Sequence, residues 1–431
     1  MSEYVSLLSQ NRNYRLLWLG YVVSQLGDWL NLIASAALVA NLTGAGVAIS
    51  YLFLARFLPL FLFSPLAGVL ADRYDRRQVL IASDVLRAVT VLGFLLVREA
   101  NDLWLIYVLT TLQFALSAIF TPARTAMLAN IVQPRQLVPA NALDSLTWST
   151  MLAFGALLGG VVAAVLGIAE AFILDALTFL VSAILISRIS APVVRQVAPS
   201  TPEVATGAGW FNFLDGLRYL RTQPFLLGVS LVKAGGALAW GAVNVIEVTF
   251  AEEIFPLSVP GLATIIPEMD GGTAALGLFY FISGLGTGLG PLLLRRWLGD
   301  APQRLRWAIA AGFGFIALGI FSLSMAPTVG WFSLGTLTRT VGSGTVWVFS
   351  AALLQMMVPD RFRGRVFAFE FALLTLTQSL SIFWAGYGQD ILGLTVRQVG
   401  LTVGWTAVLM GLLWLFFHLR MRARPEVGAP A

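Results

Sequence analysis

Twelve long apolar stretches follow one another along the chain, and short polar segments separate them. Each stretch has the length of a membrane-spanning helix, about 20 residues, and lacks the alternating ~10-residue pattern of a membrane β-strand. The pattern therefore predicts an all-α integral membrane protein with twelve transmembrane helices. The predicted spans cover residues 16–40, 47–70, 79–97, 103–123, 143–165, 168–188, 225–248, 273–294, 307–325, 330–357, 366–389 and 399–419.

The spans form two sets of six, which look like a diverged repeat. The segment 290–296 after the eighth span is a degraded echo of the loop 68–77 after the second span. Residues 189–224 separate the sets and hold three prolines, then an amphipathic stretch expected to lie on the membrane surface. We predict an N-terminal six-helix bundle at 1–188, a cytoplasmic linker with an amphipathic helix at 189–224, and a C-terminal six-helix bundle at 225–431.

Composition and charge give the expected orientation. The chain is 58% hydrophobic and only 11% charged, whereas a soluble domain is about half apolar and a quarter charged. With both termini in the cytoplasm, 21 of the 27 basic residues face inward and two face outward, as the positive-inside rule requires. We therefore expect a multi-pass protein of the cell (inner) membrane with both termini cytoplasmic. We expect no signal peptide before the first span.

The loop GVLADRYDRR, residues 68–77, stands out because it is short and rich in arginine. It resembles the signature loop between helices 2 and 3 of the major facilitator superfamily, Gly-x-x-Ala-Asp-Arg-x-Gly-Arg-Arg, with Asp75 where that form has glycine. The resemblance implies two six-helix halves and a central cavity lined by spans 1, 4, 7 and 10. It also implies a gating role for the loop, whose ionic contacts would hold one of two alternating states. The matching positions are Gly68, Leu70, Ala71, Asp72, Arg73, Arg76 and Arg77.

Further stretches resemble one exporter branch, which includes enterobactin exporters and macrolide efflux proteins. This resemblance implies export of a bulky amphipathic compound, driven by the proton gradient. Gly155, Gly159 and Gly160 are similar to the antiporter motif of drug exporters, but Ala156 stands where that motif has proline. The stretches are residues 27–44, 70–88, 121–134, 139–148, 213–220 and 358–367.

Ionisable groups at membrane depth are costly and are candidates for function. Asp28 lies near the middle of span 1, on one helical face with Ser24, Asn31 and Ser35. A carboxyl group in a dry cavity suits reversible protonation, so Asp28 is the predicted proton-coupling residue. Two alternatives for Asp28 are a neutral carboxylic acid and a structural partner of Lys233 or Arg339.

Similar polar faces recur in spans 4, 7 and 10. Lys233, the only lysine, is expected to contact substrate, to pair with a carboxylate, or to extend toward the inner interface. Asp84 and Arg87, three residues apart in span 3, are expected to form a structural pair, and Arg56 is also expected to be structural. The glycines of 284–290 are expected to serve close helix packing. The predicted substrate-cavity residues are Asn31, Gln113, Lys233, Trp240, Asn244, Arg339, Ser343 and Trp347.

The sequence thus predicts a secondary active exporter of an amphipathic small molecule, such as a drug, macrolide or siderophore, working by proton antiport and alternating access. The alternative is a lysophospholipid or metabolite transporter, a flippase or uptake protein, of the same fold. The chain has no cysteine, one peripheral histidine and no metal-protease motif, so we expect no enzyme, no metal site and no cofactor. The expected partners are the substrate, protons and the lipid bilayer, with no nucleic acid, and we expect a monomer.

Overall fold

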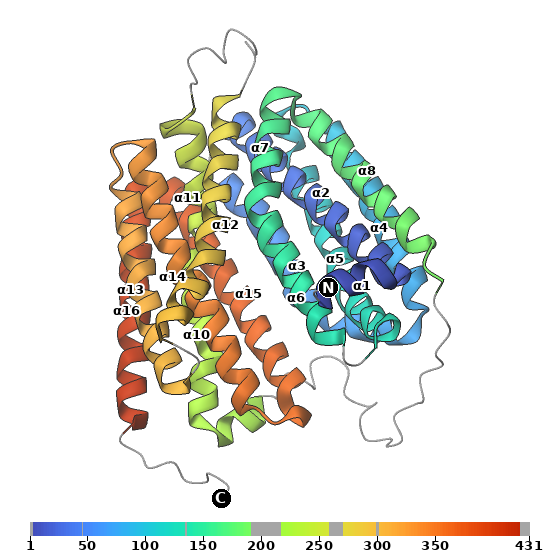
Figure 1. The fold of residues 1–431 in the computed structure, drawn as a ribbon. Coiled ribbons are helices and arrows are strands. Elements are labelled where there is room, and N and C mark those ends of the chain that lie inside the picture. Colours follow the sequence, from blue (N-terminus) through green and yellow to red (C-terminus); the bar gives the residue numbers. More distant parts are fainter. Residues whose placement is uncertain are drawn as a thin grey trace, which may run out of the picture. The chain divides into compact units, whose positions relative to one another are not determined.

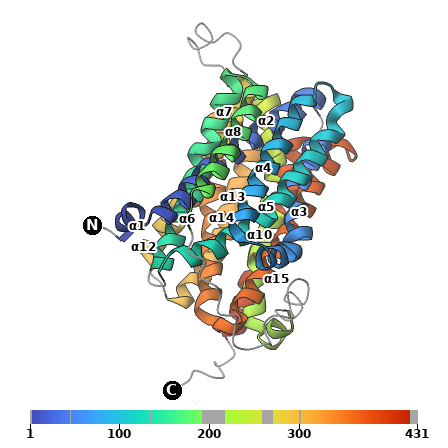
Figure 2. The same ribbon diagram turned by 90° about the vertical axis from the view of Figure 1, so that its right-hand side faces the viewer.

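A computed structural model describes residues 3–44, 46–133, 136–190, 217–257, 270–298 and 301–422. These residues are helical almost throughout, and no strand occurs among them (Figures 1 and 2). Twelve helical segments are long and apolar enough to cross a membrane. The predicted fold class and the predicted number of spans are therefore confirmed.

Ten of the spans each contain one long helix, and the other two combine shorter helical segments. The short helix α1 (Glu3–Gln10) precedes the first span. The short helix η1 (Phe94–Leu96) ends the third span, and η2 (Ala100–Asp102) begins the fourth. The fifth span combines α6, η4 and α7, and the seventh combines α10, α11 and η6. The elements are α2 (Arg12–Thr43), α3 (Gly46–Arg73), α4 (Arg76–Gly93), α5 (Leu103–Ile131), α6 (Leu137–Thr150), η4 (Met151–Gly155), α7 (Ala156–Val165), α8 (Ile168–Ser187), α10 (Pro224–Trp240), α11 (Val243–Thr249), η6 (Phe250–Ile254), α12 (Gly271–Leu298), α13 (Pro302–Ser324), α14 (Val329–Met357), α15 (Asp360–Asp390) and α16 (Val396–Arg422).

Most helices extend a few residues beyond the apolar stretches, because polar residues cap or continue them. The Asn11 side chain accepts a hydrogen bond from the Tyr14 N–H and so starts α2 at Arg12, before the predicted edge. Gly44 ends α2 in the left-handed conformation, with φ of 57°. Asp75 accepts from the Gln78 N–H at 3.0 Å and caps α4. The residue that replaces the usual glycine of the signature loop is therefore a helix cap.

Packing divides the chain into two compact units. Unit 1 comprises residues 1–211 and 247–284, and unit 2 comprises residues 212–246 and 285–431. These units reflect packing, whereas the predicted halves at 1–188 and 225–431 follow a repeat along the sequence, and that division stays a prediction. Most of the predicted linker, residues 191–216, lies outside the described residues.

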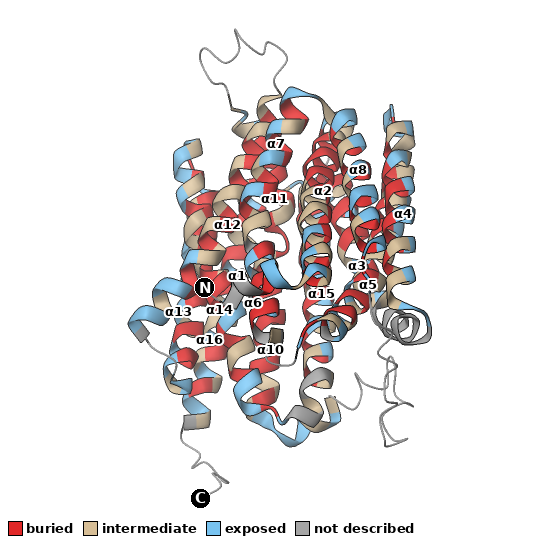
Figure 3. Cartoon of the chain, turned by 45° about the vertical axis from the view of Figure 1, so that its right-hand side comes forward, coloured by how far each residue is buried: buried red, intermediate tan, exposed pale blue. Residues whose placement is uncertain are grey.

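Exposed and buried residues are distributed as expected for a protein whose solvent is partly lipid. Each span carries buried patches against neighbouring helices and exposed patches elsewhere (Figure 3). Many exposed residues are large and apolar, including Val89 in α4, Leu318 in α13 and Trp405 in α16. Such surface would be unfavourable in water but is compatible with hydrocarbon.

Glycines let several helices approach each other closely. A Cβ atom built on Gly160 of α7 would lie 2.7 Å from the Gly277 Cα of α12. Cβ atoms on Gly286 and Gly290 of α12 would overlap Thr340 and Val341 of α14. Any larger side chain would separate these backbones, so Gly286 and Gly290 serve helix packing as predicted, whereas a Cβ atom on Gly288 would meet no atom within 4 Å.

Candidate functional site

Polar side chains from four helices of unit 1 gather in the interior of the helix bundle. Their positions follow from helix phase, because each of the four helices places at least one polar residue on a face that packs against a neighbouring helix. We call this group the Asp28 cluster. Its members are Asp28 and Asn31 of α2, Arg56 of α3, Gln113 of α5 and Asp175 of α8.

Asp28 lies beside Gln113 and within electrostatic range of Arg56. Its Oδ1 atom is buried without a hydrogen-bond partner. Gln113 is completely buried, and neither polar atom of its amide makes a hydrogen bond of normal geometry. An unsatisfied buried polar atom costs about 1–3 kcal/mol, so this arrangement is held against an energetic penalty. The two predicted residues lie together, and both retain unused hydrogen-bonding capacity.

Arg56 supplies the positive charge of the Asp28 cluster. Its Nη1 donates to the Asn31 Oδ1 at 3.4 Å, and its guanidinium carbon lies 4.4 Å from the centre of the Phe114 ring. The side chain is 7% exposed. Cation–π and amide contacts stabilise a buried guanidinium but do not neutralise it. The nearby carboxyl groups are therefore its charge partners, and Arg56 belongs to the candidate site although the sequence indicated a structural role.

Asp175 is the member that the sequence analysis missed. It is fully buried, and neither carboxylate oxygen has a hydrogen-bond partner. It lies beside Asn31 and within electrostatic range of Asp28 and Arg56. The available signal was an acid near the middle of the apolar sixth span, in FILDALTFL, which is unusual at membrane depth. Asp175 shares one face of α8 with Thr178 and Ser182, but this face alone does not identify Asp28 as its neighbour.

A second ionic group in unit 1 is a close ion pair. Arg87 pairs with Asp84, and the Ser182 hydroxyl donates to the other Asp84 oxygen at 2.7 Å. The Arg87 guanidinium also lies against two aromatic rings, with 4.4 Å to the Phe120 centroid and 4.3 Å to the Phe179 centroid. The predicted local pair is confirmed, and its dense packing indicates a structural role.

In unit 2, the Lys233 ammonium lies in a closed environment. Its Nζ atom is 3.1 Å from the Glu370 Oε2 of α15 and 4.6 Å from the centre of the Trp347 ring of α14. The Phe367 ring lies further off, at 5.9 Å. We call these four residues the Lys233 cluster. Of the alternatives for Lys233, pairing with a carboxylate is the one observed, so its charge is balanced within unit 2.

The seventh span is interrupted at membrane depth. Residues 241–242 form a turn between α10 and α11. The Ser381 hydroxyl of α15 accepts from the Ala242 N–H at 2.9 Å and donates to the Leu238 carbonyl at 2.8 Å. The Asn244 amide donates to the Gly241 carbonyl at 2.9 Å. A broken helix in a membrane needs such compensation, so Asn244, a predicted cavity residue, stabilises the break.

The other predicted cavity residues of unit 2 are spread along two helices. Trp240 is half-buried at the end of α10, with its ring against Gly236. Arg339 is buried in α14 where the Gly319 backbone of α13 packs closely. The Ser343 hydroxyl donates to the Thr340 carbonyl of its own helix at 3.2 Å. Their assignment to a substrate cavity stays a prediction.

The signature loop is described only in part. Gly68, Asp72 and Arg73 belong to α3, but their side chains lie outside the described residues. Arg76 donates to the Ala126 carbonyl in the last turns of α5 at 3.2 Å, and Arg77 donates to the Ser187 carbonyl at the end of α8. Cations stabilise the carbonyl end of a helix. These contacts connect the loop to two helix ends, which is compatible with the predicted gating role.

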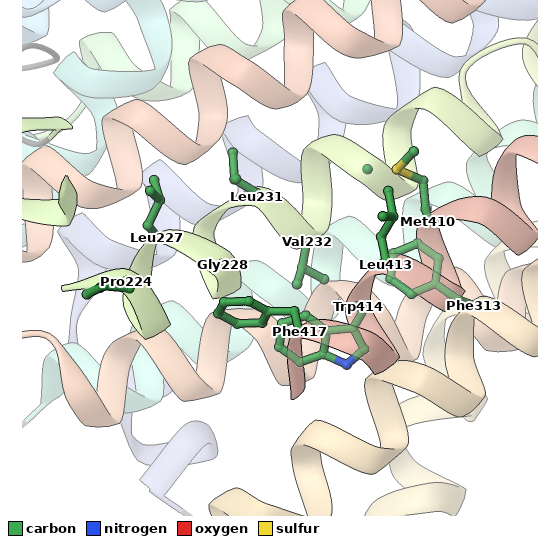
Figure 4. A pocket seen from close by; sticks show the side chains of 11 residues that line it. Pro224, Leu227, Gly228, Leu231, Val232, Phe313, Met410, Leu413, Trp414 and Phe417 are labelled. Atoms are coloured by element: carbon green, nitrogen blue, oxygen red, sulfur yellow. The ribbon is translucent and has the colours of Figure 1, made fainter. Parts of the chain in front are cut away.

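An apolar pocket of about 450 Å³ lies elsewhere in unit 2. It is formed by α10, α13 and α16, and includes Leu231, Phe313, Met410 and Phe417 (Figure 4). Its lining contains no charged side chain. This pocket can bind an apolar group, but it offers no proton donor or acceptor of the kind found in the Asp28 cluster.

Known proteins similar to this chain are membrane transporters. It is 28% identical to the uncharacterized MFS-type transporter YfiS of Bacillus subtilis, with 91% of this chain and 90% of the relative covered. It is 22% identical to macrolide efflux protein A of Streptococcus pyogenes, with 88% and 89% covered. A bacterial homolog of the human lysosomal transporter Spinster has the same fold, with a TM-score of 0.74, 13% identity, and 97% and 100% covered. The sequence model of the Major Facilitator Superfamily matches residues 17–382, and the chain belongs to this superfamily.

Proposed function

We propose that this protein is a secondary active exporter of an amphipathic small molecule, working by alternating access and proton antiport. We place it in the cell (inner) membrane with both termini cytoplasmic, because the inner loops carry nearly all the loop arginines. Membership of the superfamily supports transport of a small molecule across a bilayer. The name of macrolide efflux protein A supports the outward direction.

The observation that carries the coupling proposal is the environment of Asp28. One of its oxygens is buried without a hydrogen-bond partner, and Gln113 beside it is unsatisfied at both polar atoms. When Asp28 is protonated, its O–H is an additional hydrogen-bond donor in this cluster. When Asp28 loses that proton, its carboxylate places a negative charge near Arg56. The two protonation states therefore have different interactions, which is what a coupling residue requires.

The Lys233 cluster bears on the substrate. Two cations in the spans, Lys233 and Arg339, would by themselves favour an anionic substrate, such as a catecholate siderophore or a lysophospholipid. Glu370 neutralises Lys233, which weakens the electrostatic argument for an anion. One Glu370 oxygen remains without a hydrogen-bond partner, so a substrate hydroxyl or amide N–H can be accepted there. We therefore favour a neutral or cationic amphipathic substrate.

The test is proton release from the purified protein in weak buffer on addition of a macrolide, a catecholate siderophore or a lysophospholipid. We expect the wild type to release protons with one of these compounds, and Asp28→Asn to bind that compound without release. In everted vesicles, Asp28→Asn should lose uphill transport. The matched control is Asp102→Asn, which makes the same change at a helix cap outside the bundle interior.

Each outcome has a definite meaning. Release that persists in Asp28→Asn, or unchanged uphill transport in that variant, would contradict coupling through Asp28. Binding without proton release by the wild type would contradict antiport. Equal losses in Asp102→Asn would show that the effect is not specific to the Asp28 cluster.

The alternative function is uptake of a metabolite, or lipid flipping, by the same fold. The direction of flux separates the two. Everted vesicles that are acidic inside should accumulate the substrate, because antiport exchanges inside protons for outside substrate. Accumulation only when the outside is acidic would mean symport and would favour uptake.

A further inference from the structure

We propose that Asp28 and Asp175 form one proton site, in which the two carboxyl groups share a single proton beside the fixed charge of Arg56. That this proton is the one exchanged during transport rests on the proposed function. The sharing itself is a property of the resting protein and can be tested without substrate.

The first argument is charge balance among the groups that face Asp175. Helix α8 packs against α2, α4 and α7 (Figure 1), and α7 has no ionisable side chain. Asp84 and Arg87 of α4 form an ion pair of their own, although Arg87 also lies within electrostatic range of Asp28 and Asp175. Outside that pair the charged groups are Asp28, Asp175 and Arg56, and Arg56 is the cation near both carboxyl groups. Two ionised carboxylates and one guanidinium would leave one net negative charge in the interior.

The second argument is the lack of compensation for that charge. Neither Asp175 oxygen makes a hydrogen bond of normal geometry, although Asn31 lies beside this carboxyl group, and the buried Oδ1 of the half-buried Asp28 makes none. A buried ion without partners costs several kcal/mol, whereas a carboxyl group that takes up a proton becomes neutral and avoids this cost. One carboxyl of the pair therefore holds a proton, and the other is balanced by Arg56.

The third argument is location. A Cβ atom on Gly27 would overlap the Asp175 Oδ1, so this carboxylate lies against the backbone of α2 next to Asp28. Asn31 lies beside Asp175 and accepts a hydrogen bond from Arg56. The same residues thus connect both carboxyl groups to one cation. Because the two groups interact, the proton belongs to the pair and not to either residue alone.

Infrared spectroscopy can count this proton directly. Aspartate is labelled with ¹³C at the side-chain carboxyl, so that the protonated Asp band is separated from Glu. If the pair shares one proton, Asp28→Asn leaves Asp175 ionised beside Arg56, and Asp175→Asn does the same for Asp28. Relative to the wild type, each single variant should lose the infrared intensity of one protonated Asp carboxyl. The double variant should lose the same amount and no more.

The other patterns contradict sharing. Loss in Asp28→Asn alone would place the proton on Asp28, and loss in Asp175→Asn alone would place it on Asp175. An additive loss in the double variant would mean two separate protons. The control is Asp144→Asn, which removes a carboxylate paired with Arg124 at 2.7 Å and should leave the band unchanged.

Transport assays then connect the proton to function. Asp175→Asn should abolish uphill transport while substrate binding persists, and Asp175→Glu should restore part of it. If Asp28→Asn loses coupling but Asp175→Asn keeps both coupling and the infrared band, the shared site is wrong and the proposed function stands. If the shared band is observed but neither variant changes transport, the proton site stands and antiport through it is wrong. Gel filtration of each variant checks that it is folded.

Discussion

The Asp28 cluster and the Lys233 cluster both contain charged side chains inside a helix bundle, but the charges are balanced in only one of them. Lys233 has one carboxylate partner and an aromatic ring over its ammonium. The Asp28 cluster has two carboxyl groups for one arginine, and several of its polar atoms lack hydrogen bonds. A balanced pair resists change in its charge state, whereas an unbalanced cluster responds to a single proton. The first is suited to holding structure, and the second to coupling.

The largest expected effect comes from removing the cation of the unbalanced cluster. Arg56→Gln leaves Asp28 and Asp175 without a charge partner, so both carboxyl groups should be protonated. The protonated Asp infrared band should gain one carboxyl, and uphill transport should fall by at least about tenfold, equivalent to 1.4 kcal/mol. Arg56→Lys keeps the charge and should retain the wild-type band. An unchanged band in Arg56→Gln would contradict the charge balance proposed for this cluster.

The next effect concerns the balanced pair. Lys233→Met or Glu370→Met alone leaves an uncompensated buried charge and should destabilise the protein by about 3–5 kcal/mol. The double variant Lys233→Met/Glu370→Met should recover most of that loss, because no charge remains. Unfolding of the four proteins under identical conditions gives the coupling energy. Losses that simply add in the double variant would show that the pair contributes nothing as a pair.

The smallest effect is expected for the ring above the ammonium. Trp347→Leu removes the cation–π contact but keeps an apolar side chain, and should cost about 0.5–2 kcal/mol. Trp347→Phe retains a ring and should cost less. The free energy of unfolding should be measured for each Trp347 variant both in the wild-type protein and in the Lys233→Met protein. An equal cost in both backgrounds would mean that Trp347 contributes by packing alone.

Features that depend on local sequence could be predicted. The twelve spans follow from apolar length, and the Asp84–Arg87 pair follows from a spacing of three residues on one helix. The helix ends were predicted less accurately than the number of spans, because capping residues such as Asn11 extend a helix beyond its apolar part. The grouping of Asp28 with Gln113 was also accessible, since both lie on polar faces of helices expected near each other.

Features that depend on contacts distant in sequence could not be predicted. Lys233 and Glu370 are 137 residues apart, and nothing in either helix identifies its partner. Asp175 lies in an apolar helix, so only the packing of α8 on α2 relates it to Asp28. The hydrogen bond of Asn244 to the Gly241 carbonyl at the helix break could not be predicted either, because it depends on backbone geometry. Helix phase predicts on which face of its helix a residue lies, but it does not predict which residue of another helix packs against that face.

The closed environment of Lys233 also has a consequence for covalent chemistry. It is the only lysine in the 431-residue chain, and an ammonium held by Glu370 beneath an indole ring is a poor nucleophile. An amine-reactive ester should therefore modify this side chain only when the contact with Glu370 opens. Lys233 is thus the one side-chain amine that such an ester can report on, and the rate of its acylation, resolved from the N-terminal amine by peptide mass spectrometry, measures how often this region opens during the transport cycle.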